Sequence, residues 1–139
     1  MGIKFLDYRI LKLAFTPSNC LIDYLYEIGD NGDIDLPLSF SPIFLEDEEN
    51  IFFVHFALKV SKIDNEQDLG EFEVEFAARF SNDEGITEKF KSSHFPKVNA
   101  PAIAYPFLRA SVNNFFTSSG YSSVLLPTYN FTKVKNERK

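Results

Sequence analysis

The sequence is poor in the residues that build covalent, metal and redox sites. Its 139 residues include one cysteine, Cys20, two histidines and no tryptophan. A single cysteine cannot form an internal disulfide, and no histidine lies near Cys20 to share a zinc ion with it. The two histidines, His55 and His94, are far apart in sequence and lack the spacing of metal ligands. We therefore expect no metal site and no cofactor.

Positive charge and long apolar runs are also scarce. The chain carries 14 Lys and Arg against 20 Asp and Glu, a net charge of −6. Nucleic-acid binding requires clustered Lys and Arg to neutralise phosphates, so we expect no nucleic-acid partner. No segment reaches the ~18 apolar residues of a membrane span, and the first residues contain no uncharged run of signal-peptide length. We expect a cytoplasmic protein that does not insert into a membrane.

The sequence also lacks a recognisable catalytic constellation. It contains no glycine-rich phosphate loop, and the serines between residues 118 and 123 have no acid–base partner nearby in sequence. We expect that the protein is not an enzyme. Glu71, Glu73 and Glu75 alternate along one segment, which is typical of a solvent-facing side of a strand. The alternative is an acidic patch on which a partner docks.

Aromatic residues, in contrast, are abundant, with 16 Phe and 6 Tyr. Four segments alternate apolar and polar residues with the period of strands that bury one face. They cover residues 3–15, 34–44, 51–60 and 71–80. A short polar connection joins the last two, which predicts an antiparallel hairpin. A phase slip after Ile10 predicts a bulge in the first strand, and Pro37 and Pro42 predict an edge position or a bulge for the second.

A helix follows the strands. Apolar residues recur at helical spacing at Tyr105, Leu108, Val112 and Phe115 or Phe116. Gly120 predicts the end of this helix. The helix either begins at Pro106, or begins near Pro101 and bends at Pro106. The resulting fold class is α+β, with a four-stranded antiparallel sheet and one long C-terminal helix packed on one face.

A chain of this length suits a single domain over residues 1–139, in which 131–139 form a basic tail. Two of its connections, however, are too apolar for loops in water: residues 21–28 and the segment after the helix. Apolar loops beside a sheet can bind extended, unfolded chains without reading their sequence, at ~25 cal/mol per Å² of apolar area buried. Alternatively, Tyr24, Leu25 and Tyr26 simply cover the core. The candidate client-binding residues are Leu21, Ile22, Tyr24, Leu25, Tyr26, Tyr121, Val124, Leu125 and Leu126.

Residues 99–131, NAPAIAYPFLRASVNNFFTSSGYSSVLLPTYNF, resemble the C-terminal half of SecB-type protein-export chaperones. The positions that carry the resemblance are Tyr105, Pro106, Phe107, Leu108, Arg109, Gly120, Tyr121, Leu125, Leu126, Pro127, Asn130 and Phe131. The resemblance implies a four-stranded antiparallel sheet with a long crossover between its first two strands, assembled as a dimer of dimers. It also implies a holdase that binds unfolded precursor proteins without ATP and delivers them to the SecA motor.

Several positions depart from the family pattern. Residues 132–139 are too few for the family's second helix, which is therefore expected to be truncated, and they are basic where the export chaperones end in an acidic tail. Ala110 stands where a Glu usually follows the motif arginine. Glu73 matches one of the acidic positions at which the family docks SecA. Lys12 and Thr16 fall near two other such positions and are not acidic. Client holding is thus better supported than delivery to SecA. The alternatives are a dedicated chaperone of an antitoxin in a toxin–antitoxin system and a binder of small hydrophobic ligands.

Overall fold

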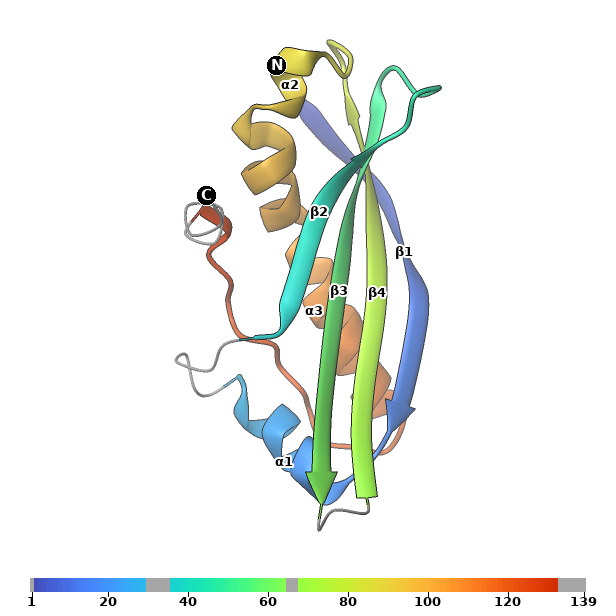
Figure 1. The fold of residues 1–139 in the computed structure, drawn as a ribbon, viewed down its shortest axis with the longest axis vertical. Helices are drawn as coiled ribbons and strands as arrows, with labels where there is room; N and C mark the ends of the chain where they lie inside the picture. The colour runs from blue at the N-terminus through green and yellow to red at the C-terminus, as the bar shows by residue number, and fades with distance from the viewer. Residues whose placement is uncertain (1, 30–35, 65–67, 133–139) are drawn as a thin grey trace.

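Four strands form a single antiparallel sheet in the order β1-β4-β3-β2 (Figure 1). The computed structural model describes residues 2–29, 36–64 and 68–132. The strands are β1 (Ile3–Thr16), β2 (Leu38–Phe44), β3 (Ile51–Asp64) and β4 (Asp68–Asn82). The helices are α1 (Asn19–Glu27), α2 (Glu88–Lys91) and α3 (Ala100–Ser118), with a π-helical turn η1 (Phe95–Asn99) directly before α3. The predicted α+β fold, with a four-stranded sheet and one long helix on one face, is confirmed (Figure 1).

The hairpin of β3 and β4 is longer than the sequence pattern indicated. Pairing runs without a break from Ile51 opposite Ser81 to Asp64 opposite Asp68, so most of the predicted polar linker over 61–70 is strand. The predicted edge position of β2 is confirmed, because β2 pairs with β3 alone. An edge position tolerates Pro42, which has no N–H to donate to a second neighbour.

Two irregularities bend β1 where it pairs with β4. The register shifts between Ile10 and Lys12, which confirms the bulge predicted from the phase slip. A second shift, between Phe5 and Asp7, was not predicted. Its extra residue is Leu6, so the alternation of side chains in β1 is interrupted there as well. Bulges of this kind raise the local twist of an edge strand and redirect its side chains.

The core lies between one face of the sheet and α3. The buried face of β3 consists of Phe52, Val54, Phe56, Leu58 and Val60, and that of β4 of Phe72, Val74, Phe76, Ala78 and Phe80. The helix begins at Ala100, not at Pro106, and continues through Pro106 at the loss of one backbone hydrogen bond. Its buried stripe is Tyr105, Leu108, Val112 and Phe116. Of the two phenylalanines predicted for the end of this stripe, the buried one is therefore Phe116. Gly120, with φ of +93°, follows its end as predicted.

The crossover between β1 and β2 contains a helix, α1, that the sequence analysis did not predict. The side chain of Ser18 caps it by accepting a hydrogen bond from the backbone N–H of Leu21 at 3.2 Å. Leu21, Leu25 and Ile28 recur at helical spacing and are fully buried. A side-chain carbon on Gly70 would collide with Ser18 and Leu21, so glycine lets α1 lie directly against β4.

Candidate functional site

Two motif residues of α3 hold the segment that follows it. The Tyr105 hydroxyl donates a hydrogen bond to the carbonyl oxygen of Pro127, and Arg109 Nε donates one to that of Leu126, both at 2.5 Å. Residues four apart share one face of a helix, so the spacing of Tyr105 and Arg109 directs both donors at the same stretch of chain. Burial raises the pKa of the Tyr105 phenol, which keeps it protonated as a donor. The family motif thus positions the loop.

The other motif residues also shape this segment. Gly120 provides the left-handed turn at the end of α3, and Asn130 is exposed. Phe131 is buried in a cluster of aromatic rings. Its ring centroid lies 4.8 Å from that of Phe40 in β2 and 5.7 Å from that of Tyr105. The end of the loop therefore closes the core beneath the edge strand.

The two apolar segments singled out in the sequence meet in space. The backbone N–H of Ser122 donates to the Tyr26 hydroxyl of α1 at 3.1 Å, and the N–H of Val124 donates to Asn113 Oδ1 of α3 at the same distance. A side-chain carbon on Gly29, just after α1, would collide with the carbonyl oxygen of Leu125. Helix α1, helix α3 and the loop after it therefore form one packed unit.

The structure divides the nine candidate client-binding residues into two groups. Leu21, Leu25, Val124 and Leu126 are fully buried and belong to the core. Ile22, Tyr24, Tyr26 and Tyr121 are partly exposed, and Leu125 is 49% exposed. Ile22 and Tyr26 lie one turn apart on the face of α1 that meets the loop, together with Tyr121 and Leu125. We call Ile22, Tyr26, Tyr121 and Leu125 the α1–loop surface.

Tyr24 is placed differently. It lies two positions from both Ile22 and Tyr26, so it points away from the face that they share. The ammonium of Lys62, in β3, lies 4.4 Å from the centroid of the Tyr24 ring, a distance typical of a cation–π contact. Tyr24 therefore belongs to the side of α1 that meets the hairpin.

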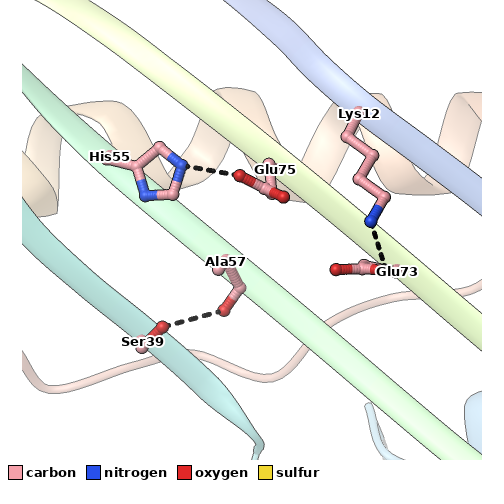
Figure 2. A network of polar contacts seen from close by, with 6 residues as sticks. All are labelled: Lys12, Ser39, His55, Ala57, Glu73 and Glu75. Carbon is pink, nitrogen blue, oxygen red and sulfur yellow. Dashed lines mark hydrogen bonds and ion pairs between the residues drawn. The ribbon is translucent and has the colours of Figure 1, made fainter.

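The three glutamates of β4 alternate with its buried residues and so lie on the face of the sheet opposite the helices. Figure 2 shows two of them, Glu73 and Glu75, with their partners. Lys12 Nζ of β1 lies 3.0 Å from Glu73 Oε1, and His55 Nε2 of β3 lies 3.1 Å from Glu75 Oε1. The hydrogen bond to Glu73 raises the pKa of Lys12 above its usual value. Two of the three carboxylates thus have cross-strand partners. Neither partner could be predicted from the sequence, because their positions depend on the strand order and on the bulges of β1.

A second apolar surface was also missed. On the helix side, β1 and α3 leave five large apolar residues about two-fifths exposed: Tyr8, Ile10, Leu13, Ile103 and Phe107. We call these five the β1–α3 apolar surface. The Phe107 ring stacks on Phe5 at 4.7 Å, which joins the strand and the helix. Beside them a hollow of about 480 Å³ reaches the C-terminal turns of α3 at Phe115 and Ser119.

In the part of the chain that the structure describes, neither a metal-binding cluster nor a membrane-spanning helix is found. Among residues 2–29, 36–64 and 68–132, no group of three or more His, Cys, Asp or Glu side chains is arranged to hold a metal ion. Within the same ranges, no helix combines the length and the apolar character that crossing a membrane demands.

Comparisons with known proteins agree with the fold. A family model described as preprotein translocase subunit SecB matches residues 25–139. The chain is also similar to a solved structure, the SecB-like chaperone of Mycobacterium tuberculosis in complex with a ChAD peptide from the HigA1 antitoxin. That match has a TM-score of 0.59 and 17% identity, and covers 92% of this chain and 91% of the other. A search of curated proteins found no match. Because the family model spans well over half of the sequence, the chain belongs to the SecB family.

Proposed function

We propose that this SecB-family protein is an ATP-independent holdase that binds unfolded polypeptides on the α1–loop surface. The observation that carries the proposal is the junction of α1 with the loop, where Ile22, Tyr26, Tyr121 and Leu125 keep part of their apolar area accessible. Contacts of this kind contribute ~25 cal/mol per Å² buried whatever the client's sequence. A holdase needs such tolerance, because its clients share extended backbone and apolar side chains and little else.

The buried members of the predicted site have a supporting role in this proposal. Leu21 and Leu25 fix α1 on the sheet, while Val124 and Leu126 fix the loop on α3. Tyr105 and Arg109 hold the same loop through its carbonyls. The client then meets a surface whose shape is set beforehand, which lowers the entropy lost on binding. Tyr24 stays outside this surface, on the side of α1 that meets β3.

Suppression of aggregation by a stoichiometric amount of the protein tests the proposal. The test protein is a chemically unfolded enzyme diluted into buffer without ATP, and light scattering follows its aggregation. We expect protection by the unaltered protein and a clear loss of protection in the Tyr26→Ser, Leu125→Ser double variant, which alters two residues of the α1–loop surface. Tyr26→Phe is the matched control, because it keeps the ring and removes only the hydroxyl that Ser122 uses. Absence of protection, or equal protection by the double variant, would contradict the proposal.

We further propose that the β1–α3 apolar surface is covered by a second copy of the chain, within a dimer of dimers. Support comes from Ile10 and Leu13 of the edge strand β1 and Phe107 of the adjacent helix α3, which are 43%, 37% and 39% exposed. Contiguous exposed apolar patches mark protein interfaces more often than free surface. Light scattering after size exclusion should show a mass of two or four chains. Ile10→Glu should reduce that mass, whereas a monomeric unaltered protein would contradict this assembly.

Two client systems fit a holdase in the cytoplasm: export through SecA and protection of an antitoxin. The acidic row of β4, Glu71, Glu73 and Glu75, is the surface we propose for docking a partner such as SecA. Lys12 compensates the charge of Glu73, and a hydrogen bond with His55 engages Glu75, which leaves fewer carboxylates available to a partner and favours the antitoxin role as a second candidate. The related structure from Mycobacterium tuberculosis, which holds an antitoxin peptide, supports the same candidate. Capture of purified SecA by the protein, lost in Glu73→Lys, would favour export instead.

A further inference from the structure

Leu125 belongs to the α1–loop surface, and the two residues beside it fix the direction in which it points. Val124 and Leu126 are fully buried, whereas Leu125 is 49% exposed. Successive side chains of an extended segment point to opposite sides, so Leu125 points outward as long as its two neighbours point inward. The feature that holds the loop in this register therefore decides whether Leu125 is available to a client.

The apolar pattern of the loop distinguishes only weakly between two registers. After a shift by one residue, Leu125 and Pro127 would point inward. Val124 and Leu126 would then point outward. Two apolar residues are buried in either register, and the free energy gained from burying them is similar. Burial alone thus gives only a small preference for the register in which Leu125 is exposed.

Hydrogen bonds to α3 fix the register on both sides of Leu125. Before it, Asn113 Oδ1 accepts a hydrogen bond from the backbone N–H of Val124 at 3.1 Å. After it, Arg109 Nε donates a hydrogen bond to the carbonyl oxygen of Leu126. Asn113 and Arg109 are four residues apart and so lie on one face of α3. Backbone groups alternate in direction along an extended chain, so a shift by one residue would turn both partners away from that face.

Asn113 is the less adaptable of these two anchors. Arg109 has five N–H donors on a long side chain, and every residue of the loop has a carbonyl, so Arg109 can find a new acceptor after a shift. Asn113 has one acceptor oxygen on a short side chain, which reaches few N–H groups. The positions that carry the SecB motif include Arg109 and do not include Asn113.

We propose that Asn113 is a positioning residue, which sets the register of the loop and so presents Leu125 to unfolded clients. Asn113 acts through the backbone N–H of Val124, which lies directly before Leu125. The consequence for clients rests on the proposed holdase function. The register itself is a property of the loop that can be measured without any client.

Thiol labelling of the full-length protein measures the register. The protein carries Cys20→Ser, because Cys20 is exposed, together with either Val124→Cys or Leu125→Cys. With Asn113 present, iodoacetamide should modify position 125 at least about tenfold faster than position 124, because buried thiols react slowly. Asn113→Ala should lower this ratio several-fold. Val74→Cys in β4, at a position that is 1% exposed, reports opening of the whole fold and should stay slow throughout.

Two further variants locate the effect. Asn113→Asp keeps an acceptor oxygen at the same reach, so it should restore most of the labelling ratio. Asn114→Ala makes the same change as Asn113→Ala at an exposed position, where the amide oxygen accepts a hydrogen bond from Ser118 of the same helix at 3.4 Å. It should leave the ratio unchanged. Alanine is a better helix former than asparagine, which partly offsets the lost hydrogen bond, so Asn113→Ala should change Tm by only a few degrees.

Suppression of aggregation then connects the register to clients. In the protein without cysteine changes, Asn113→Ala should raise the amount needed for half-maximal protection several-fold. Asn113→Asp and Asn114→Ala should protect about as well as the unaltered protein.

The possible results separate the register from the function. An unchanged labelling ratio in Asn113→Ala overturns the proposal, as does an equal fall in Asn114→Ala, no recovery in Asn113→Asp, or equal acceleration at positions 74 and 124. A lowered ratio with full protection would overturn the link between the register and clients. If the unaltered protein protects no client, the holdase proposal fails, and the labelling ratio still decides whether Asn113 sets the register.

Discussion

The hydrogen bond from Tyr105 to the loop gives a sharp prediction for Tyr105→Phe. The substitution removes one hydroxyl and keeps a ring that is 4% exposed and packed against Tyr129 and Phe131. The hydrogen bond itself contributes about 1 kcal/mol, and leaving the Pro127 carbonyl without its partner can raise the cost to about 2 kcal/mol. For a domain of this size, 1 kcal/mol corresponds to about 3–5 °C in Tm.

Urea unfolding followed by circular dichroism measures the free energy of unfolding of Tyr105→Phe. Hydrogen exchange of the backbone amides between residues 122 and 130 reports where the loss occurs, and we expect faster exchange there than in the sheet. The matched control is Thr117→Ala, whose hydroxyl bonds to carbonyls of its own helix at an exposed position, and which should cost less than about 0.5 kcal/mol. Equal stability of Tyr105→Phe and the unaltered protein, with unchanged exchange, would refute the role of the motif tyrosine as a loop anchor.

Three further substitutions test the packing around the same unit. Gly29→Ala places a carbon against the Leu125 carbonyl and should lower the free energy of unfolding, measured with heat or urea, by about 1–3 kcal/mol. An unchanged free energy would mean that α1 and the loop are not in contact. At Gly120 an added side-chain carbon meets no other atom, but the backbone keeps a φ of +93°. Gly120→Ala should therefore lower the free energy of unfolding by about 1 kcal/mol from backbone strain alone, and an unchanged free energy would argue against this turn. Phe116→Ala empties a fully buried position and should cost about 3–5 kcal/mol; a cost below about 1 kcal/mol would place this ring outside the core.

The strands and the long helix were predictable because their patterns are long and regular. Alternation in β3 and β4 repeats over enough residues to identify both the strands and their buried faces. Short elements are harder, and α1 was missed because six of the eight residues from Leu21 to Ile28 are aliphatic or aromatic, which obscures the helical periodicity. Ser18 after Pro17 was the available signal, since it is a favoured N-cap residue.

The candidate site was predictable by residue type but not by exposure. Sequence reasoning identified both apolar segments, yet it could not separate Leu25 and Leu126, which are buried, from Leu125, which is exposed. That separation depends on how α1 and the loop pack against each other. The pairs Lys12–Glu73 and His55–Glu75 were likewise out of reach, because they join strands distant in sequence. The two bulges in β1 decide which of its side chains point to each face of the sheet. Only the second bulge, after Ile10, was visible in the sequence as a phase slip in the alternation.

The central claim is that unfolded clients bind at the junction of α1 and the loop, and site-specific photo-crosslinking tests it most directly. A photoreactive side chain replaces Leu125, which is 49% exposed, or, as the control, Ile43 on the opposite face of β2, which is 40% exposed. On illumination with an unfolded client, position 125 should crosslink, the yield should fall once the client has refolded, and position 43 should give little product. Equal crosslinking at the two positions, or crosslinking at position 43 alone, would contradict the account.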